Sequence, residues 1–337
     1  ADGTLVLRIA ELSDSNLKYE SWREYTSLIE HVDLSQLDTS RAKDLRNLFY
    51  GCTSLQSVDL SQLDMSNVTS MRGMFTDCKN LKSINLSGID TSNVTDMSSM
   101  FSGCQSLESL DLSQLNTTNV TDMNRMFTDC KNLQFVNLSG IDAINVTNMS
   151  NMFNGCKKLG SIDLSAFKTA NITNVAWMFY GCEALKSMNL SGLDMSSVTD
   201  MSNMFASCKS LESINLQGIN TSNATNMGWM FFGCESLKSI DLSDLDTSST
   251  TNMTSMFDGC KSLNSIDISQ LDTSNVTSMA AMFANCESLS RIDLSNLNAS
   301  KATDMRMMFS GCKALKDSNL SNVDASNVTN MASMFLG

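Results

Sequence analysis

Cysteine is the residue whose spacing in this sequence first suggests chemistry. It stands at position 52 and then every 26 residues to position 312, eleven times in all. Such a column could bind metal, form disulfides or line a core. Zinc sites need a second set of ligands at short spacing, which this column does not offer. An odd number of equivalent thiols, about 4.8 Å apart if the coils stack like strands, favours a buried thiol column.

Carboxylates form a second regular set. Asp or Asn recurs once in every repeat, between two apolar residues in all but the last, and is expected to point out of a sheet. Stacked carboxylates would repel each other, and interleaved asparagines relieve that charge. Calcium takes carboxylate oxygens, but no compact loop of ligands is present, so we expect neither metal nor other cofactor. The first members of this sheet-face column that we consider for binding are Asp59, Asn85, Asp111, Asn137 and Asp163.

The composition argues against several functional classes. The chain has 337 residues, 42% hydrophobic and 18% charged, which is enough apolar material for a sizeable core. Its formal net charge of -13 disfavours nucleic acid and anionic lipid as partners, and no apolar run is long enough to insert into a membrane. His31 is the single histidine, and the carboxylates are spread evenly along a ridge instead of converging in a cleft. We therefore expect a protein that is not an enzyme.

A strict repeat must position these residues. Phenylalanine recurs every 26 residues from position 49 to position 335 without insertion or deletion. Self-similarity at this period predicts a solenoid, in which each coil buries its apolar edge against its neighbours. We expect about twelve coils in a solenoid spanning 32–337, which lacks a C-terminal cap. Residues 1–31 are expected to form an N-terminal capping segment, in which Trp22 and Tyr25 cover the first coil.

Each repeat contains two kinds of apolar pattern. In one, Ile84 and Leu86 lie two apart, as one face of a strand requires. In the other, Met97, Met100 and Phe101 lie at helical spacing after Thr95, which could cap a short helix. The predicted fold class is therefore α/β: a right-handed leucine-rich-repeat-like solenoid with a parallel sheet on one side and short helices on the other. The residue before each Cys is Gly, Asp, Asn or Ser, which suits a left-handed helix end.

Two surface columns indicate how the coils are held in register. The first column consists of asparagines, each of which is the first residue of an Asn-x-Thr sequon. Glycans on neighbouring coils would collide, so we expect these asparagines to make turn hydrogen bonds instead. The sequon positions are Asn67, Asn93, Asn119, Asn145, Asn171, Asn223, Asn275 and Asn327. The other column alternates in charge, which favours ion pairs between coils, each worth under about 1 kcal/mol. Its members are Glu183, Lys209, Glu235, Lys261, Glu287 and Lys313.

Aromatic residues interrupt one polar column and form our main candidate binding patch. The position two before Phe is small or polar in most repeats, but it is tryptophan at Trp177 and Trp229. Three residues later stand Tyr180 and Phe232. Exposed aromatic side chains could stack on sugar rings or anchor a protein partner. Drift on a tolerant surface, or contact with another copy of the chain, would give the same sequence.

Two weaker candidate sites remain. Phe135 replaces a usual Ser beside the sheet, while Phe167 and Lys168 replace the usual Leu or Ile and Asp of the turn. The sheet-face column of Asp and Asn is the rival site for a protein ligand. The sequence does not decide among these surfaces.

The repeats resemble those of a known family. "LDLSQLNTTNVTDMNRMFTDC" and "IDISQLDTSNVTSMAAMFANC" resemble the 26-residue repeats of BspA-like leucine-rich repeat surface proteins, over roughly residues 32–337. The resemblance implies a bacterial cell-surface or secreted protein, and we expect signal and anchor segments to be absent from this chain. It also implies adhesion to a host or bacterial surface protein, mucin or glycan. The alternative is a structural stalk or spacer without its own ligand.

Overall fold

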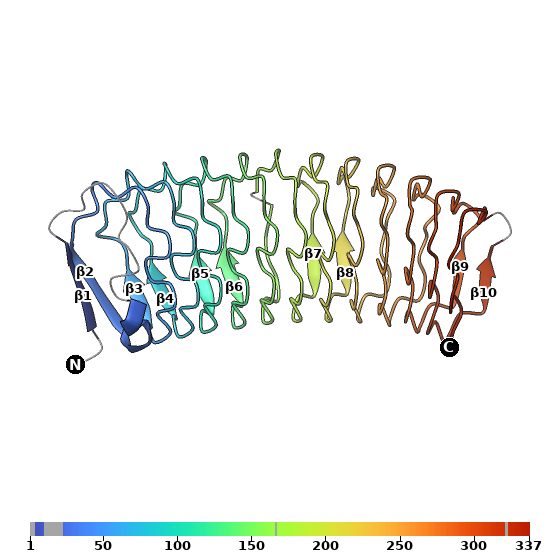
Figure 1. Ribbon diagram of the computed structural model, residues 1–337, viewed down its shortest axis with the longest axis horizontal. Coiled ribbons are helices and arrows are strands. Elements are labelled where there is room, and N and C mark those ends of the chain that lie inside the picture. Colours follow the sequence, from blue (N-terminus) through green and yellow to red (C-terminus); the bar gives the residue numbers. More distant parts are fainter. Residues whose placement is uncertain (1–3, 10–22, 166, 321–322) are drawn as a thin grey trace. The chain divides into compact units, whose positions relative to one another are not determined.

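The computed structural model describes residues 4–9, 23–165, 167–320 and 323–337. Its contacts divide the chain into two compact units, residues 1–169 and 170–337, and each unit is a stack of similar coils (Figure 1). Within the described residues, no helix is long and apolar enough to cross a membrane. The coil-on-coil arrangement confirms the predicted solenoid within each unit.

Short parallel strands mark one side of the coils in each unit (Figure 1). Strands from successive coils pair residues that are 26 positions apart, as in Val58 with Ile84 and Met188 with Ile214. The parallel pairs are β1–β2, β3–β4, β5–β6, β7–β8 and β9–β10. In the first unit the strands are β1 Thr4–Ile9, β2 His31–Leu37, β3 Ser57–Asp59, β4 Ser83–Asn85, β5 Ser109–Asp111 and β6 Phe135–Asn137. In the second unit they are β7 Ser187–Asn189, β8 Ser213–Asn215, β9 Arg291–Asp293 and β10 Asp317–Asn319.

The core is built from columns of identical side chains. Phe75 and Phe101 are fully buried, with ring centroids 5.8 Å apart and an interplanar angle of 2°. The Met and Leu columns are buried beside them. The cysteines are buried thiols, as predicted. Cys104 Sγ donates to the carbonyl of Phe75 in the preceding coil at 3.2 Å, so the thiol column also links the coils.

The short helices expected from the sequence are not found in the described residues. Among the residues that the structure describes, the one helical element is the 3-10 helix η2, Arg23–Leu28. The Met-x-x-Met-Phe segments are instead successive turns, so the assignment of short helices is wrong. Consecutive turns place Met97, Met100 and Phe101 inward just as a helix would, because both structures bring residues three and four apart to the same side.

Hydrogen bonds between coils replace those of a helix. In one segment, the N–H groups of Met97, Ser99 and Phe101 donate to carbonyls of the next coil at 2.8–3.1 Å. Ser99 also has a φ of +56°, which would break a helix. Thr95 is not a helix cap, because its N–H and its hydroxyl both donate to the carbonyl of Thr69 in the preceding coil. The residue before each Cys does have positive φ, as predicted, although it ends a turn instead of a helix.

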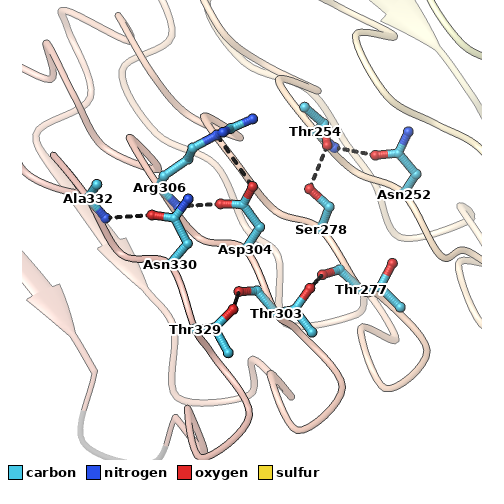
Figure 2. Close-up of polar contacts among 10 residues, drawn as sticks. All are labelled: Asn252, Thr254, Thr277, Ser278, Thr303, Asp304, Arg306, Thr329, Asn330 and Ala332. Carbon is cyan, nitrogen blue, oxygen red and sulfur yellow. Dashed lines mark hydrogen bonds and ion pairs between the residues drawn. The ribbon is translucent and has the colours of Figure 1, made fainter.

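Polar side chains form further columns between coils. Thr329 Oγ1 donates to the carbonyl of Thr303, and Thr303 Oγ1 to that of Thr277, at 3.1 and 3.3 Å (Figure 2). Seven sequon asparagines donate to backbone carbonyls, as predicted, but the acceptor lies in the turn of the preceding coil, as with Asn93 Nδ2 donating to the carbonyl of Ser66 at 2.7 Å. The same bond recurs at Asn67, Asn119, Asn145, Asn223, Asn275 and Asn327. These bonds satisfy carbonyls on the surface of each unit and fix the register of its coils.

The N-terminal segment begins with a strand that joins the first coil. β1 pairs in parallel with β2 through a register that starts at Thr4 with His31. Tyr25 is 58% exposed and so is not packed over the coil, contrary to the covering role suggested for it. Trp22 lies outside the described residues. The capping role of residues 1–31, the count of twelve coils and the right-handed sense stay predictions.

Candidate functional site

Three of the shallow grooves in the described part of the chain lie on the strand side of the coils. Each is lined by outward Asp, Asn and Ser side chains of two successive coils, with volumes of about 380, 370 and 340 Å³. The first lies between β6 and residues 161–165, the second between residues 265–269 and β9, and the third between β8 and residues 241–244. The sheet-face column therefore forms part of real concave surfaces.

The first groove brings together residues that the sequence had placed in separate candidate sites. Phe135 stands at its edge with its side chain 58% exposed. Asn137 and Asp163 of the rival sheet-face column line the same groove. The serines Ser139, Ser161 and Ser165 complete the polar lining. These serines were not identified from the sequence, because Ser recurs at those positions in many coils and so does not stand out as a binding residue.

The sheet-face carboxylates are held in place by their own coils. Asp163 Oδ1 accepts a hydrogen bond from the N–H of Ser165 at 2.8 Å, and the same pattern joins Asp59 to Ser61. The Ser165 hydroxyl and N–H lower the pKa of Asp163, so this exposed carboxyl is ionised at neutral pH. Asn85 Nδ2 donates to Asp59 Oδ1 at 2.9 Å, which confirms the predicted relief of charge by interleaved asparagine.

The main candidate patch lies on the turn side of the second unit. Trp177 and Tyr180 have ring centroids 4.8 Å apart and are tilted by 47°. Trp229 and Phe232 occupy the same positions two coils further on, and both are exposed. The coil between them is in register with both, because Trp177 N donates to Ser202 O and Asn203 N donates to Gly228 O. We call Trp177, Tyr180, Trp229 and Phe232 the aromatic cluster.

The two tryptophans occupy an unfavourable backbone conformation. Their φ angles are +62° and +58°, a region that costs a residue with a Cβ about 1–2 kcal/mol. The fold requires this angle at that position of every described coil, although only Asn47, Gly73, Asn151 and Asn203 are residue types that adopt it readily. The column consists of Asn47, Gly73, Ser99, Arg125, Asn151, Trp177, Asn203, Trp229, Ser255, Ala281, Met307 and Ser333. Trp177 and Trp229 thus combine backbone strain with side chains that are 37% and 36% exposed.

The structure places the remaining weaker candidates, Phe167 and Lys168, in different environments. Phe167 is 4% exposed because its position is the inward Leu or Ile of the turn, so its ring belongs to the core. Lys168 is exposed next to it. This placement removes Phe167 from the candidate surface and leaves Phe135 with the sheet-face groove.

The thiols offer little chemistry. Burial raises the pKa of the Cys52 thiol to about 12 and that of Cys312 to about 11. The more deeply buried Cys104 has a pKa raised well above the ordinary value for the same reason. Because the thiolate is the nucleophile and the metal ligand, these side chains are inert in the folded protein. In the described part of the chain, no group of three or more His, Cys, Asp or Glu is placed to hold a metal ion.

The geometry defines a class: a parallel β-solenoid of leucine-rich-repeat type, with a polar grooved face and an aromatic cluster among its turns. The chain belongs to the family described as "Mycoplasma protein of unknown function, DUF285", whose model matches residues 19–137, 128–242 and 228–337. The matched ranges contain the 26-residue repeats, and this match confirms the expected BspA-like family. No curated protein is similar to the chain in sequence.

Several solved structures are similar to this chain. A leucine-rich cell surface protein of Faecalibacterium prausnitzii is 22% identical over 87% of this chain and 76% of its own, with a TM-score of 0.45. A leucine-rich repeat protein of Bacteroides ovatus is 20% identical over 86% and 78% of the two chains, with a TM-score of 0.49. One from Eubacterium ventriosum is 17% identical over 94% and 80%, with a TM-score of 0.48.

Proposed function

We propose that this protein is a non-enzymatic binding module of a bacterial cell surface, which holds a host or bacterial surface protein, mucin or glycan. The aromatic cluster makes the principal contact. The observation that carries the proposal is the pair of exposed tryptophans in a column where most coils have a small or polar residue. Each one leaves apolar surface in water, and a bound partner would bury it.

The arrangement of the cluster suits binding of an extended partner. Trp177 and Trp229 are two coils apart, which is about 10 Å at the spacing of stacked strands. Each has a second aromatic ring three residues later, at Tyr180 and Phe232. Two aromatic anchors on a rigid frame lose little side-chain entropy on binding, and their contributions combine when one partner reaches both. The surrounding polar columns would contribute hydrogen bonds at the rim.

Substitutions within the repeat provide a direct test. We would measure binding of the whole chain to a panel of mucins, host matrix proteins and glycans, beside the double variant Trp177→Asn/Trp229→Asn. Asparagine already occupies this left-handed position at Asn151 and Asn203, so the variant retains the fold. Ser99→Asn, at the same position of a coil in the first unit, is the matched control.

We expect the double variant to lose binding and the control to retain it. Binding that survives in the double variant would move the principal contact to the sheet-face grooves. Failure of every member of the panel to bind would contradict the proposal and favour a stalk or spacer. Thermal unfolding of all three proteins establishes that any loss is not a loss of fold.

A further inference from the structure

We propose that the groove beside Phe135 is a separate sugar-binding subsite, which takes one uncharged pyranose unit of a glycan. The groove lies wholly within the first unit, whereas the aromatic cluster lies in the second. The inference therefore does not depend on the proposed role of the tryptophans. Its basis is the combination of a concave surface, an exposed ring and fixed polar groups at one place.

The groove lies between two successive coils whose strands are not hydrogen-bonded to each other. β5 pairs with β6, and just beyond them Leu112 N donates to Asn137 O at 3.0 Å. In the described part of the first unit, no strand pairs with β6 on its other side, and no equivalent bond joins Leu138 to Asp163. The two coils leave a hollow of about 380 Å³ between their outward side chains. Small-molecule sites begin at roughly 300 Å³, so the hollow suits a ligand of one ring.

Phe135 gives the groove a flat apolar wall. Its residue is 58% exposed, so the ring is available to a ligand without rearrangement of the core. The C–H face of a pyranose packs on an aromatic ring, and this contact excludes water from one side of the sugar. The same strand position is serine in most other coils, as at Ser57, Ser83, Ser109, Ser161, Ser187 and Ser213.

The polar lining is suited to sugar hydroxyls. Asp163 is an ionised carboxylate with about four acceptor positions, of which Ser165 uses two through its N–H and hydroxyl. The positions left over can accept from two adjacent hydroxyls of a ring. Asn137 Oδ1 is fixed by the N–H of Ser139 at 3.1 Å, so its amide is also preoriented. A carboxylate in the lining, on a chain of net charge -13, disfavours acidic sugars and makes the expected ligand uncharged.

The two other grooves show what distinguishes this one. They occupy the same place between coils and have similar volumes. One is lined by Asp267, Arg291 and Asp293, and the other by Asp241 and Asp244. Neither has an aromatic wall, so neither offers a stacking surface to a pyranose. Among the three grooves described, the Phe135 groove alone combines a ring with hydrogen-bonding groups.

Titration of simple sugars by saturation-transfer NMR tests the subsite with the full chain. The probes are the methyl pyranosides of glucose, galactose, mannose and N-acetylglucosamine, with N-acetylneuraminic acid as the charged comparison. We expect at least one neutral pyranoside to bind weakly and the acidic sugar not to bind. Phe135→Ser should weaken this binding about tenfold, and Asp163→Asn should weaken it several-fold.

Both variants introduce a residue that the same column already carries elsewhere in the chain, so we expect the melting temperature to stay the same. Ser99→Asn, at a turn position outside the groove lining and outside the aromatic cluster, should leave pyranoside binding unchanged. Ser213→Phe places a ring beside the equivalent groove at β8 and should add a second weak site. Absence of binding by every pyranoside, or binding that Phe135→Ser leaves intact, would overturn the inference. Equal binding of N-acetylneuraminic acid would overturn the requirement for an uncharged ring.

Discussion

Two sets of aromatic side chains in the same turns behave in opposite ways. Phe179 and Phe205 are fully buried, with ring centroids 5.5 Å apart and an interplanar angle of 6°. Trp177, two residues before Phe179, is exposed and has a left-handed backbone. The buried rings gain from packing against their copies, whereas the exposed ring leaves apolar surface in contact with water. Repetition marks the scaffold here, and the exposed break in the repetition is where we propose that a partner binds.

Alkaline pH should have the largest effect on the scaffold. A thiol ionises near pH 9.0 when exposed, but burial raises the pKa of Cys52 to about 12. Between those values the unfolded chain binds fewer protons than the folded one, so the free energy of unfolding falls as pH rises. Each buried thiol contributes about 1.4 kcal/mol per pH unit, and coils that unfold together add their contributions.

Urea unfolding at pH 8, 9 and 10 measures this slope. A variant with Cys78→Ala and Cys104→Ala should be less stable at pH 8 but lose stability less steeply above pH 9. Equal slopes for the two proteins would show that other groups cause the alkaline sensitivity.

Truncation of one inward ring should have the next largest effect. Phe101→Ala leaves a cavity between Phe75 and Phe127 and should reduce the free energy of unfolding by about 3–5 kcal/mol. Phe135→Ser, an exposed aromatic in the same unit, should change it by less than about 0.5 kcal/mol. Chemical denaturation of both variants measures the two changes. Similar losses in the free energy of unfolding would mean that Phe135 also belongs to the scaffold.

Substitution of the exposed tryptophans should separate binding from stability. Trp177→Asn relieves a backbone cost of about 1–2 kcal/mol but loses the partial packing of the indole. These effects oppose each other, so we expect the free energy of unfolding to change by less than about 1 kcal/mol while binding is lost. A calorimetric melting curve and a binding isotherm on the same sample provide the test. A large loss of stability would show that the indole is scaffold after all.

The ion pairs between coils should have the smallest effect. Lys261 Nζ lies 3.0 Å from Glu235 Oε2, and Lys209 and Lys313 form similar pairs with Glu183 and Glu287, as their alternating charges predict. All are largely exposed, so a double-mutant cycle with Glu235→Gln and Lys261→Gln should give a coupling of about 0.2–1 kcal/mol. The coupling should shrink in high salt, and a coupling that salt does not change would point to packing of the lysine stem.

Much of the fold could be predicted because every repeat shows the same pattern of inward and outward residues. The inward columns, the outward Asp and Asn residues and the turn hydrogen bonds of the sequon asparagines all follow from which side a residue must face. The short helices could not be excluded in this way. A helix and a series of turns put Met97, Met100 and Phe101 on the same side, and the sequence does not show that Ser99 has a φ of +56°.

The candidate sites were less predictable. The break in repetition identified Trp177, Trp229 and Phe135, but it also identified Phe167, because a change of residue does not reveal whether the new side chain faces inward. The groove depends on where strand pairing lapses between coils, as between β6 and residues 161–165. Neighbouring coils have nearly the same strand residues, so the lapse has no local signature in the sequence.

The in-register hydrogen bonds of the Thr column constrain how this chain can change in length. Each hydroxyl donates to a carbonyl exactly one repeat earlier, so a deletion of one residue would misplace every column that follows it within the unit. A deletion or duplication of 26 residues would leave every column aligned. Unequal recombination between the similar coding repeats would make such changes readily. Related genes should therefore differ in length by whole repeats, and the number of coils in the protein would vary between strains in steps of one.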